Sequence, residues 1–109
     1  MVSNQKICGL IGLATKAGKI VAGTDACLEE IEKKNVKLLI LASNVAERTR
    51  KTFIEKCKKN NIVVYEGLTI EEISNSIGKT NKATVGIKDK GFAQAINKVI
   101  SGGEMIGEN

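Results

Sequence analysis

Residues 36–47, VKLLILASNVAE, decide the fold of this chain. Seven residues from Val36 to Ala42 are apolar except for Lys37, which predicts a strand buried on both faces of a sheet, in a mainly parallel and central position. Asn44 and Glu47 have the spacing of a capping box, in which Asn44 caps a helix and Glu47 reaches back. The stretch therefore predicts a buried strand followed by a helix to about residue 60.

The same reasoning extends outward over the 109 residues. Ser3 is expected to cap a helix that runs to residue 16, and Thr24 or Asp25 a helix that runs to residue 34. Thr69 is expected to cap a helix that ends at Gly78, and Asp89 a last helix that runs to residue 100. Extended segments are expected at residues 20–21, 62–65 (a second core strand) and 83–87, and a frayed tail over residues 102–109. Helices that alternate with strands predict a three-layer α/β/α sandwich with a small mixed sheet, in one domain over residues 1–109.

The amino-acid composition excludes several classes of function. With three aromatic residues in the chain (Phe53, Tyr65 and Phe92), the core is aliphatic, and a row of aromatics for stacking single-stranded bases is nearly excluded. Cys8, Cys27 and Cys57 fall at apolar helical positions, so we expect buried thiols and a reducing, cytoplasmic location. Without histidine or a Cys-x-x-Cys pair, neither a zinc site nor another cofactor is expected, and no signal peptide or membrane span is predicted.

The positive charge is grouped along the chain. The net charge is +5, with +3 in residues 1–20, +4 in residues 46–60 and +4 in residues 78–101, whereas the segments between them are negative. Basic segments that alternate with acidic ones can gather on one side of a fold, as in nucleic-acid-binding proteins. A lysine-rich solubilising surface is the alternative.

Two fragments resemble nucleotide-binding loops but lack their essential residues. Residues 12–19 have five residues rather than four between the glycines, and Ile20 stands where Ser or Thr would bind magnesium. Gly78-Lys79-Thr80 follows a predicted helix instead of a strand. Paired carboxylates such as Glu29-Glu30 lie on helices whose charged residues normally face water, so we expect no enzyme.

Residues 9–25, GLIGLATKAGKIVAGTD, carry the strongest functional signal. Glycine turns at Gly18 and Gly23 are expected to bring two helix ends, Lys16 and Lys19 onto one edge, and a helix N-terminus beside lysines suits phosphate. The turns at residues 43–44 and 78–82 are expected at the same edge. Such a combination of amides, hydroxyls and lysines fits folded RNA, although each turn alone is an ordinary cap.

Several segments of the chain resemble those of a known family. Gly23-Thr24-Asp25, the run from Lys37 to Asn44, residues 61–64 and the helix to Gly78 resemble the kink-turn-binding ribosomal-protein superfamily of archaeal and eukaryotic large subunits. Residues 9–23 and Lys90-Gly91-Phe92 are most similar to its bacterial YlxQ-type members. The resemblance covers about residues 5–100 and implies an RNA-binding protein on an α/β/α fold.

The resemblance also includes an altered motif. In the superfamily, Gly-x-Asn-Glu-x-x-Lys grips the sheared G·A pairs and backbone of a kinked RNA. Here Asp25, Ala26 and Glu29 stand at the Asn, Glu and Lys positions, and only Gly23 is retained. Residues 79–82, which match the loop over the extruded nucleotide, are basic and more polar than usual.

These observations predict non-enzymatic binding of structured, ribosomal RNA, with ribosome-associated proteins as further partners and no membrane or small-molecule substrate. The alternative is a protein-interaction adaptor that uses the helix of residues 46–60. The residues expected to contact RNA are Lys16, Lys19, Gly23, Thr24, Asp25, Ser43, Asn44, Arg48, Gly78, Lys79, Thr80, Asn81 and Lys82.

Overall fold

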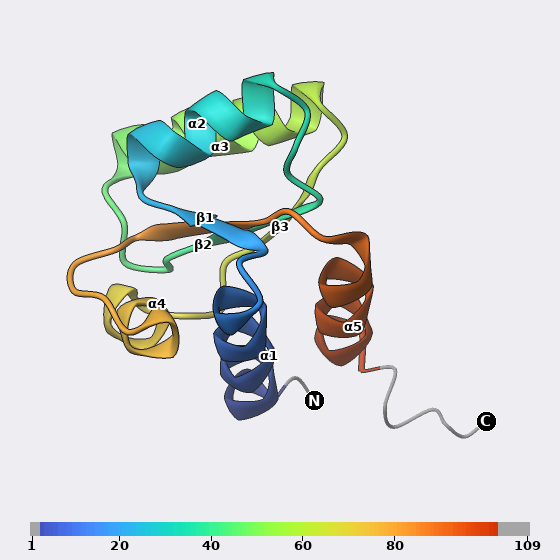
Figure 1. Ribbon diagram of the computed structural model, residues 1–109. Helices are drawn as coiled ribbons and strands as arrows, with labels where there is room; N and C mark the ends of the chain where they lie inside the picture. Colours follow the sequence, from blue (N-terminus) through green and yellow to red (C-terminus); the bar gives the residue numbers. More distant parts are fainter. Residues whose placement is uncertain (1–2, 103–109) are drawn as a thin grey trace.

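A computed structural model describes residues 3–102, and the predicted tail lies, apart from Gly102, outside them. The helices are α1 (Asn4–Lys16), α2 (Thr24–Glu32), α3 (Glu47–Lys59), α4 (Ile70–Ile77) and α5 (Lys90–Ile100). The strands are β1 (Ile20–Ala22), β2 (Leu38–Leu41), β3 (Val63–Tyr65) and β4 (Thr84–Ile87). Helices α2 and α3 cover one face of the sheet and α1, α4 and α5 the other, which confirms the three-layer sandwich (Figure 1).

The strands form one mixed sheet in the order β1-β4-β2-β3. Strand β2 is internal, parallel to β3 and antiparallel to β4, and β4 is antiparallel to β1. The central position of β2 is confirmed, but only one of its two neighbours is parallel. Strand β3, predicted as a core strand, forms an edge of the sheet with Val63 52% exposed.

Both faces of β2 are buried because its side chains alternate between two aliphatic cores. Leu38 and Ile40 pack with α1, α4 and α5, and Leu39 and Leu41 pack with α2 and α3. On β4, Gly86 allows close packing in the second core, since a Cβ atom there would lie 2.9 Å from Cγ1 of Val21. These contacts hold the strand ends, and hence the loops that follow them, in fixed positions.

Three predicted helix caps are confirmed, and in each the capping side chain accepts from an amide three residues later. Ser3 accepts from the Lys6 amide, Asp89 accepts from the Phe92 amide, and Thr69 and Glu72 form the predicted capping box. The other two predicted caps are wrong. Ala46 occupies the N-cap of α3 without a side-chain bond, and Gly23 occupies that of α2, so Thr24 is the first helical residue.

Candidate nucleic-acid interface

Three loops meet at one end of the sheet. Strands β1 and β2 are both antiparallel to β4, so the residues that follow β1 and β2 lie beside those that precede β4. The Gly23 amide donates to Thr84 O at 3.0 Å, and the Ala42 amide donates to Ala83 O at 2.8 Å. We call this end the Gly23 edge; it comprises residues 23–25, 43–44, 48 and 78–82 (Figure 1).

Lys16 and Lys19 do not belong to the Gly23 edge. They precede β1, whereas Gly23 follows it, and the Lys19 carbonyl accepts from the Lys88 amide beyond the other end of β4 at 2.8 Å. At about 3.3 Å per residue, Lys19 lies about 13 Å from Gly23 along the chain. The prediction that all four turns share one edge is therefore wrong for these two lysines.

The start of α2 is open at the Gly23 edge. Gly23 has φ 102° and ψ 154°, a conformation that residues with a side chain rarely adopt, and no side chain of the described residues caps the helix. The amides of the first turn consequently have no partner within the helix. The Lys82 ammonium lies over this turn, with Nζ 3.7 Å from where a Cβ atom of Gly23 would be. A cation and a helix N-terminus thus occupy one surface.

The loop that carries Lys82 is fixed by hydrogen bonds to Ser74 of α4. Helix α4 ends at Gly78 in the left-handed conformation (φ 70°), and Asn81 is also left-handed (φ 55°). The buried hydroxyl of Ser74 accepts from the Lys82 amide at 2.8 Å and donates to the Lys82 carbonyl at 3.2 Å. The loop therefore exposes Lys79, Thr80 and Asn81 while its far end is fixed.

Ser74 is a residue of the site that the sequence did not single out. It stands among the apolar positions of α4, between Ile73 and Ile77, and a hydroxyl on the inner face of a helix needs a partner. That signal predicts a bond from Ser74 to a neighbouring loop.

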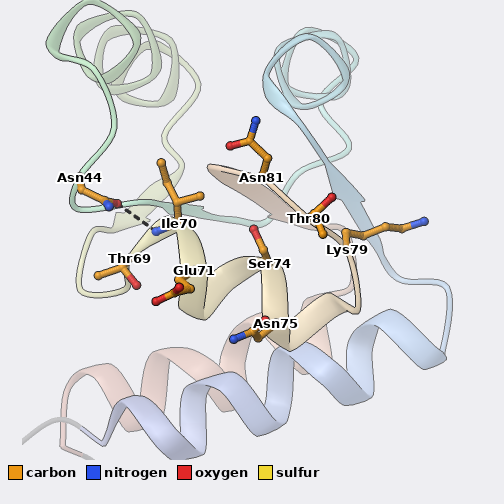
Figure 2. Close-up of a pocket in the computed structure, with 9 residues that line it drawn as sticks. All are labelled: Asn44, Thr69, Ile70, Glu71, Ser74, Asn75, Lys79, Thr80 and Asn81. Atoms are coloured by element: carbon orange, nitrogen blue, oxygen red, sulfur yellow. Dashed lines mark hydrogen bonds between the residues drawn. The ribbon is translucent and has the colours of Figure 1, made fainter.

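A polar hollow of about 550 Å³ lies beside this loop (Figure 2). On the side of the hollow away from this loop, Asn44 Oδ1 accepts from the Ile70 amide at 2.9 Å and so joins the loop after β2 to the start of α4 (Figure 2). Amides, hydroxyls, one lysine and the carboxylate of Glu71 line it, an arrangement that can bond base edges or sugars. The lining residues are Asn44, Thr69, Ile70, Glu71, Ser74, Asn75, Lys79, Thr80 and Asn81.

Arg48 and Arg50 lie in the first turn and a half of α3 and differ in their surroundings. Arg50 makes two bonds to Glu66, Nε to Oε1 at 2.6 Å and Nη2 to Oε2 at 3.2 Å, and the Glu66 carboxylate raises the pKa of Arg50. Arg48 is exposed at the Gly23 edge, and no carboxylate of residues 3–102 pairs with it. Its guanidinium is thus available to an anion.

Helix α3, which the alternative prediction assigns as the binding face of a protein-interaction adaptor, exposes charged residues. Its buried residues are Phe53 and Cys57, and Lys51, Glu55 and Lys58 are exposed. The large exposed hydrophobic residues of the described chain are Leu13 and Val63, on other elements. Within residues 3–102, no helix is long and apolar enough to cross a membrane.

A family model matches residues 5–97, and its description is the ribosomal protein L7Ae/L30e/S12e/Gadd45 family. The chain belongs to this family. It is similar to the RNA-binding protein YlxQ of Enterococcus faecium, with 33% identity over 92% of this chain and 96% of the relative. It is also similar to YlxQ of Bacillus subtilis (strain 168), with 34% identity over 84% and 89%. The resemblance to YlxQ-type members is thereby confirmed.

Solved structures show the same fold. A protein of unknown function from Bacillus halodurans C superposes with a TM-score of 0.85 at 28% identity, over 88% of this chain and 97% of the other. A Giardia lamblia 15.5 kDa RNA-binding protein superposes with a TM-score of 0.76 over 94% and 88%. At 10% identity, the second likeness concerns the fold alone.

Proposed function

We propose that this protein binds structured RNA through the Gly23 edge. The observation that carries the proposal is the position of Lys82 over the uncapped first turn of α2. Backbone amides at a helix N-terminus and an ammonium group beside them both favour a phosphate. Family membership and relatives that are named RNA-binding proteins support it.

The surrounding residues extend the surface from one phosphate to a folded RNA. Lys79, which lines the hollow, and Arg48, at the start of α3, add exposed cations. Asn44, Thr80 and Asn81 add groups that donate and accept hydrogen bonds. Phosphate contacts orient the RNA, and the amides and hydroxyls of the hollow contact sugars or exposed base edges. Ser43 belongs to this surface through its place beside Asn44.

The exposed face of α2 disfavours a standard kink-turn as the RNA ligand. Asp25 and Glu29 are four residues apart, so both carboxylates project from one side of the helix, where they are exposed. Ala26, beside them, offers no polar group. Two anions at this face repel the phosphates that a lysine holds in the superfamily, so recognition relies on Lys82, the loop and the hollow.

The proposed role is binding without catalysis, on ribosomal or ribosome-associated RNA in the cytoplasm. The family description names ribosomal proteins, which supports a ribosomal ligand. The chain has no histidine to act as an acid or base near neutral pH, and its cysteines are thiols, two of them buried.

The test is a titration of fluorescent structured RNA, isolated by its binding to the protein, over a range of salt concentrations. The Lys79→Gln/Lys82→Gln variant should bind more weakly, with a slope of log K against log salt reduced by about two units, one for each phosphate that is no longer neutralised. Lys6→Gln/Lys98→Gln removes the same charge from exposed sites on α1 and α5 and serves as the control. Equal effects of the two variants would refute the assignment of the Gly23 edge.

A further inference from the structure

The opposite end of the sheet carries more lysines than the Gly23 edge. Helices α1, α2 and α3 end there, and strands β1 and β2 begin there, beside the end of β4. We call it the lysine edge. Its exposed lysines are Lys16, Lys19, Lys33, Lys34, Lys37, Lys58, Lys59, Lys88 and Lys90.

Helix dipoles account for part of this charge. Lys16, Lys33, Lys34, Lys58 and Lys59 lie at or just beyond the C-terminal turns of three helices. Cations at that position interact favourably with the partial negative charge of the last carbonyl groups. These lysines therefore have a structural role whether or not the surface binds anything.

Four lysines have no such explanation, and three of them, Lys19, Lys37 and Lys88, lie side by side across the sheet. The register pairs Ile87 of β4 with Ile20 of β1 and with Leu38 of β2, and one residue further it places Lys88 between Lys19 and Lys37. The Lys88 amide donates to Lys19 O at 2.8 Å, and the Lys37 amide donates to Ile87 O at 2.7 Å. With strands about 4.8 Å apart, their Cα atoms form a row about 10 Å long. Like charges directly opposite one another destabilise a sheet.

Among residues 3–102, Lys88 is the one member of this row that pairs with a carboxylate. The Glu30 carboxylate lies 3.4 Å from Lys88 Nζ and 3.9 Å from Lys33 Nζ. A bond from Asn35, with help from Lys88 and Lys33, lowers the pKa of Glu30, which keeps it charged. Lys19 and Lys37 take part in no ion pair among residues 3–102.

A polar recess of about 230 Å³ extends the row towards α3, between the turns that precede β2 and β3. Lys37 and Lys34 line it, and Lys34 Nζ donates to Asn60 Oδ1 at 3.0 Å. Asn60 and Asn61 also line it and add side-chain amides to the ammonium groups. The other acidic groups nearby are engaged: Glu32 pairs with Lys56, and Asp89 caps α5.

We infer that the lysine edge is a second RNA-binding surface, which contacts the phosphate backbone through Lys19 and Lys37, with Lys34 and Lys16 at its border. A line of ammonium groups suits a regular phosphate backbone and reads no sequence. Because the two surfaces lie at opposite ends of the sheet, one molecule can hold two RNA segments at once. This second surface is independent of the Gly23 edge and can be tested separately from it.

The first experiment titrates a plain 20-base-pair RNA duplex at several salt concentrations. Lys19→Gln/Lys37→Gln should weaken binding by about 10- to 100-fold at 0.1 M salt and reduce the salt slope by about two units, because two phosphates are no longer neutralised. Lys6→Gln/Lys98→Gln, with the same net charge, should have little effect. Both lysines are exposed and repel Lys88, so the variant should unfold at the temperature of the wild type or above it.

The second experiment measures bridging, as the retention of a fluorescent RNA duplex on beads that carry another duplex. The wild type should retain it, and both Lys19→Gln/Lys37→Gln and Lys79→Gln/Lys82→Gln should abolish retention. Retention and duplex affinity that are unchanged in Lys19→Gln/Lys37→Gln, with no retention in Lys79→Gln/Lys82→Gln, would refute the second surface and leave the proposed function standing. Binding to phosphatidylserine vesicles that requires Lys19 and Lys37, with RNA affinity unaffected, would also overturn it.

Discussion

Asn44 Oδ1 accepts a hydrogen bond from the backbone amide of Ile70, 26 residues later in the chain, at 2.9 Å. The amide of Ile70 is the first of α4, so it has no partner within that helix. A side chain that follows β2 therefore helps to position α4 and, through α4, the loop of residues 78–82. The Gly23 edge depends on this long-range hydrogen bond.

The hydrogen bond allows the structural role of Asn44 to be separated from a role in RNA binding. Asn44→Ala should lower the free energy of unfolding by about 1 kcal/mol, the usual value of one hydrogen bond. Asn44→Asp keeps the acceptor and should retain most of the stability, but it removes the amide donor and adds a negative charge. Urea denaturation and RNA titration of both variants check this. If Asn44→Asp is as stable as the wild type and binds RNA equally well, Asn44 acts only in the fold.

Two glycines provide a matched pair for stability. Gly23→Ala forces a Cβ atom onto a residue with φ 102° and should cost about 1–3 kcal/mol, with weaker RNA binding as the start of α2 shifts. Gly9→Ala lies inside α1 with no atom within 4 Å of the new Cβ, so it should stabilise the protein by up to about 1 kcal/mol. Thermal unfolding of both variants is the measurement. A Gly23→Ala variant as stable as the wild type would contradict the described turn.

The buried thiols should make stability depend on alkaline pH. Burial, with a smaller contribution from Cys27, raises the pKa of Cys57 from 9.0 to about 11. The unfolded chain releases this proton at lower pH than the folded one, so stability is retained below pH 9 and falls as the pH rises from about 9 to 11. Urea midpoints measured across this range should fall more steeply for the wild type than for Cys57→Ala. Parallel curves for the two proteins would show that Cys57 titrates normally.

The altered α2 motif should determine which RNA is bound. Each RNA interaction that Asp25, Ala26 or Glu29 fails to make costs about 1–3 kcal/mol, so affinity for a standard kink-turn should be no better than for a plain duplex of equal length. Titration of both RNAs at physiological salt tests this, and nanomolar, kink-specific binding by the wild type would contradict it. The triple variant Asp25→Asn/Ala26→Glu/Glu29→Lys should regain some kink-turn affinity.

Local patterns predict much of the fold. The caps at Ser3, Thr69 and Asp89 bond residues three positions away, and the apolar run of β2 reports burial on both of its faces. Asn44 has the spacing of a cap for α3, but its actual partner, Ile70, is distant in sequence and leaves no local signal. The composition of β3 is that of a core strand and does not reveal that the strand lacks a neighbour on one side.

The sequence predicts part of the candidate site, because its turns can be recognised from local patterns. Residues 23–25 and 43–44 follow strands, and residues 78–82 precede one, so they share an edge because β4 is antiparallel to β1 and β2. The alternation of helices and strands places these turns at strand ends but does not indicate the direction of β4. Lys16 and Lys19 are close to Gly23 in sequence, which favours a common edge. The three residues of β1, however, cross the sheet and carry Gly23 to the other end.

RNA binding at the Gly23 edge can be tested by ultraviolet crosslinking of the wild-type protein to RNA in cells, followed by mass spectrometry of the peptides that carry nucleotides. If the Gly23 edge and the lysine edge bind RNA, crosslinks should fall at residues 23–25, 43–44 and 78–82, with a second group around residues 19 and 37. The attached RNA should be structured and ribosomal. RNA crosslinks confined to residues 51–57 of α3 or 91–100 of α5, or no crosslinked RNA from a protein that is present and folded, would show that the Gly23 edge does not bind RNA.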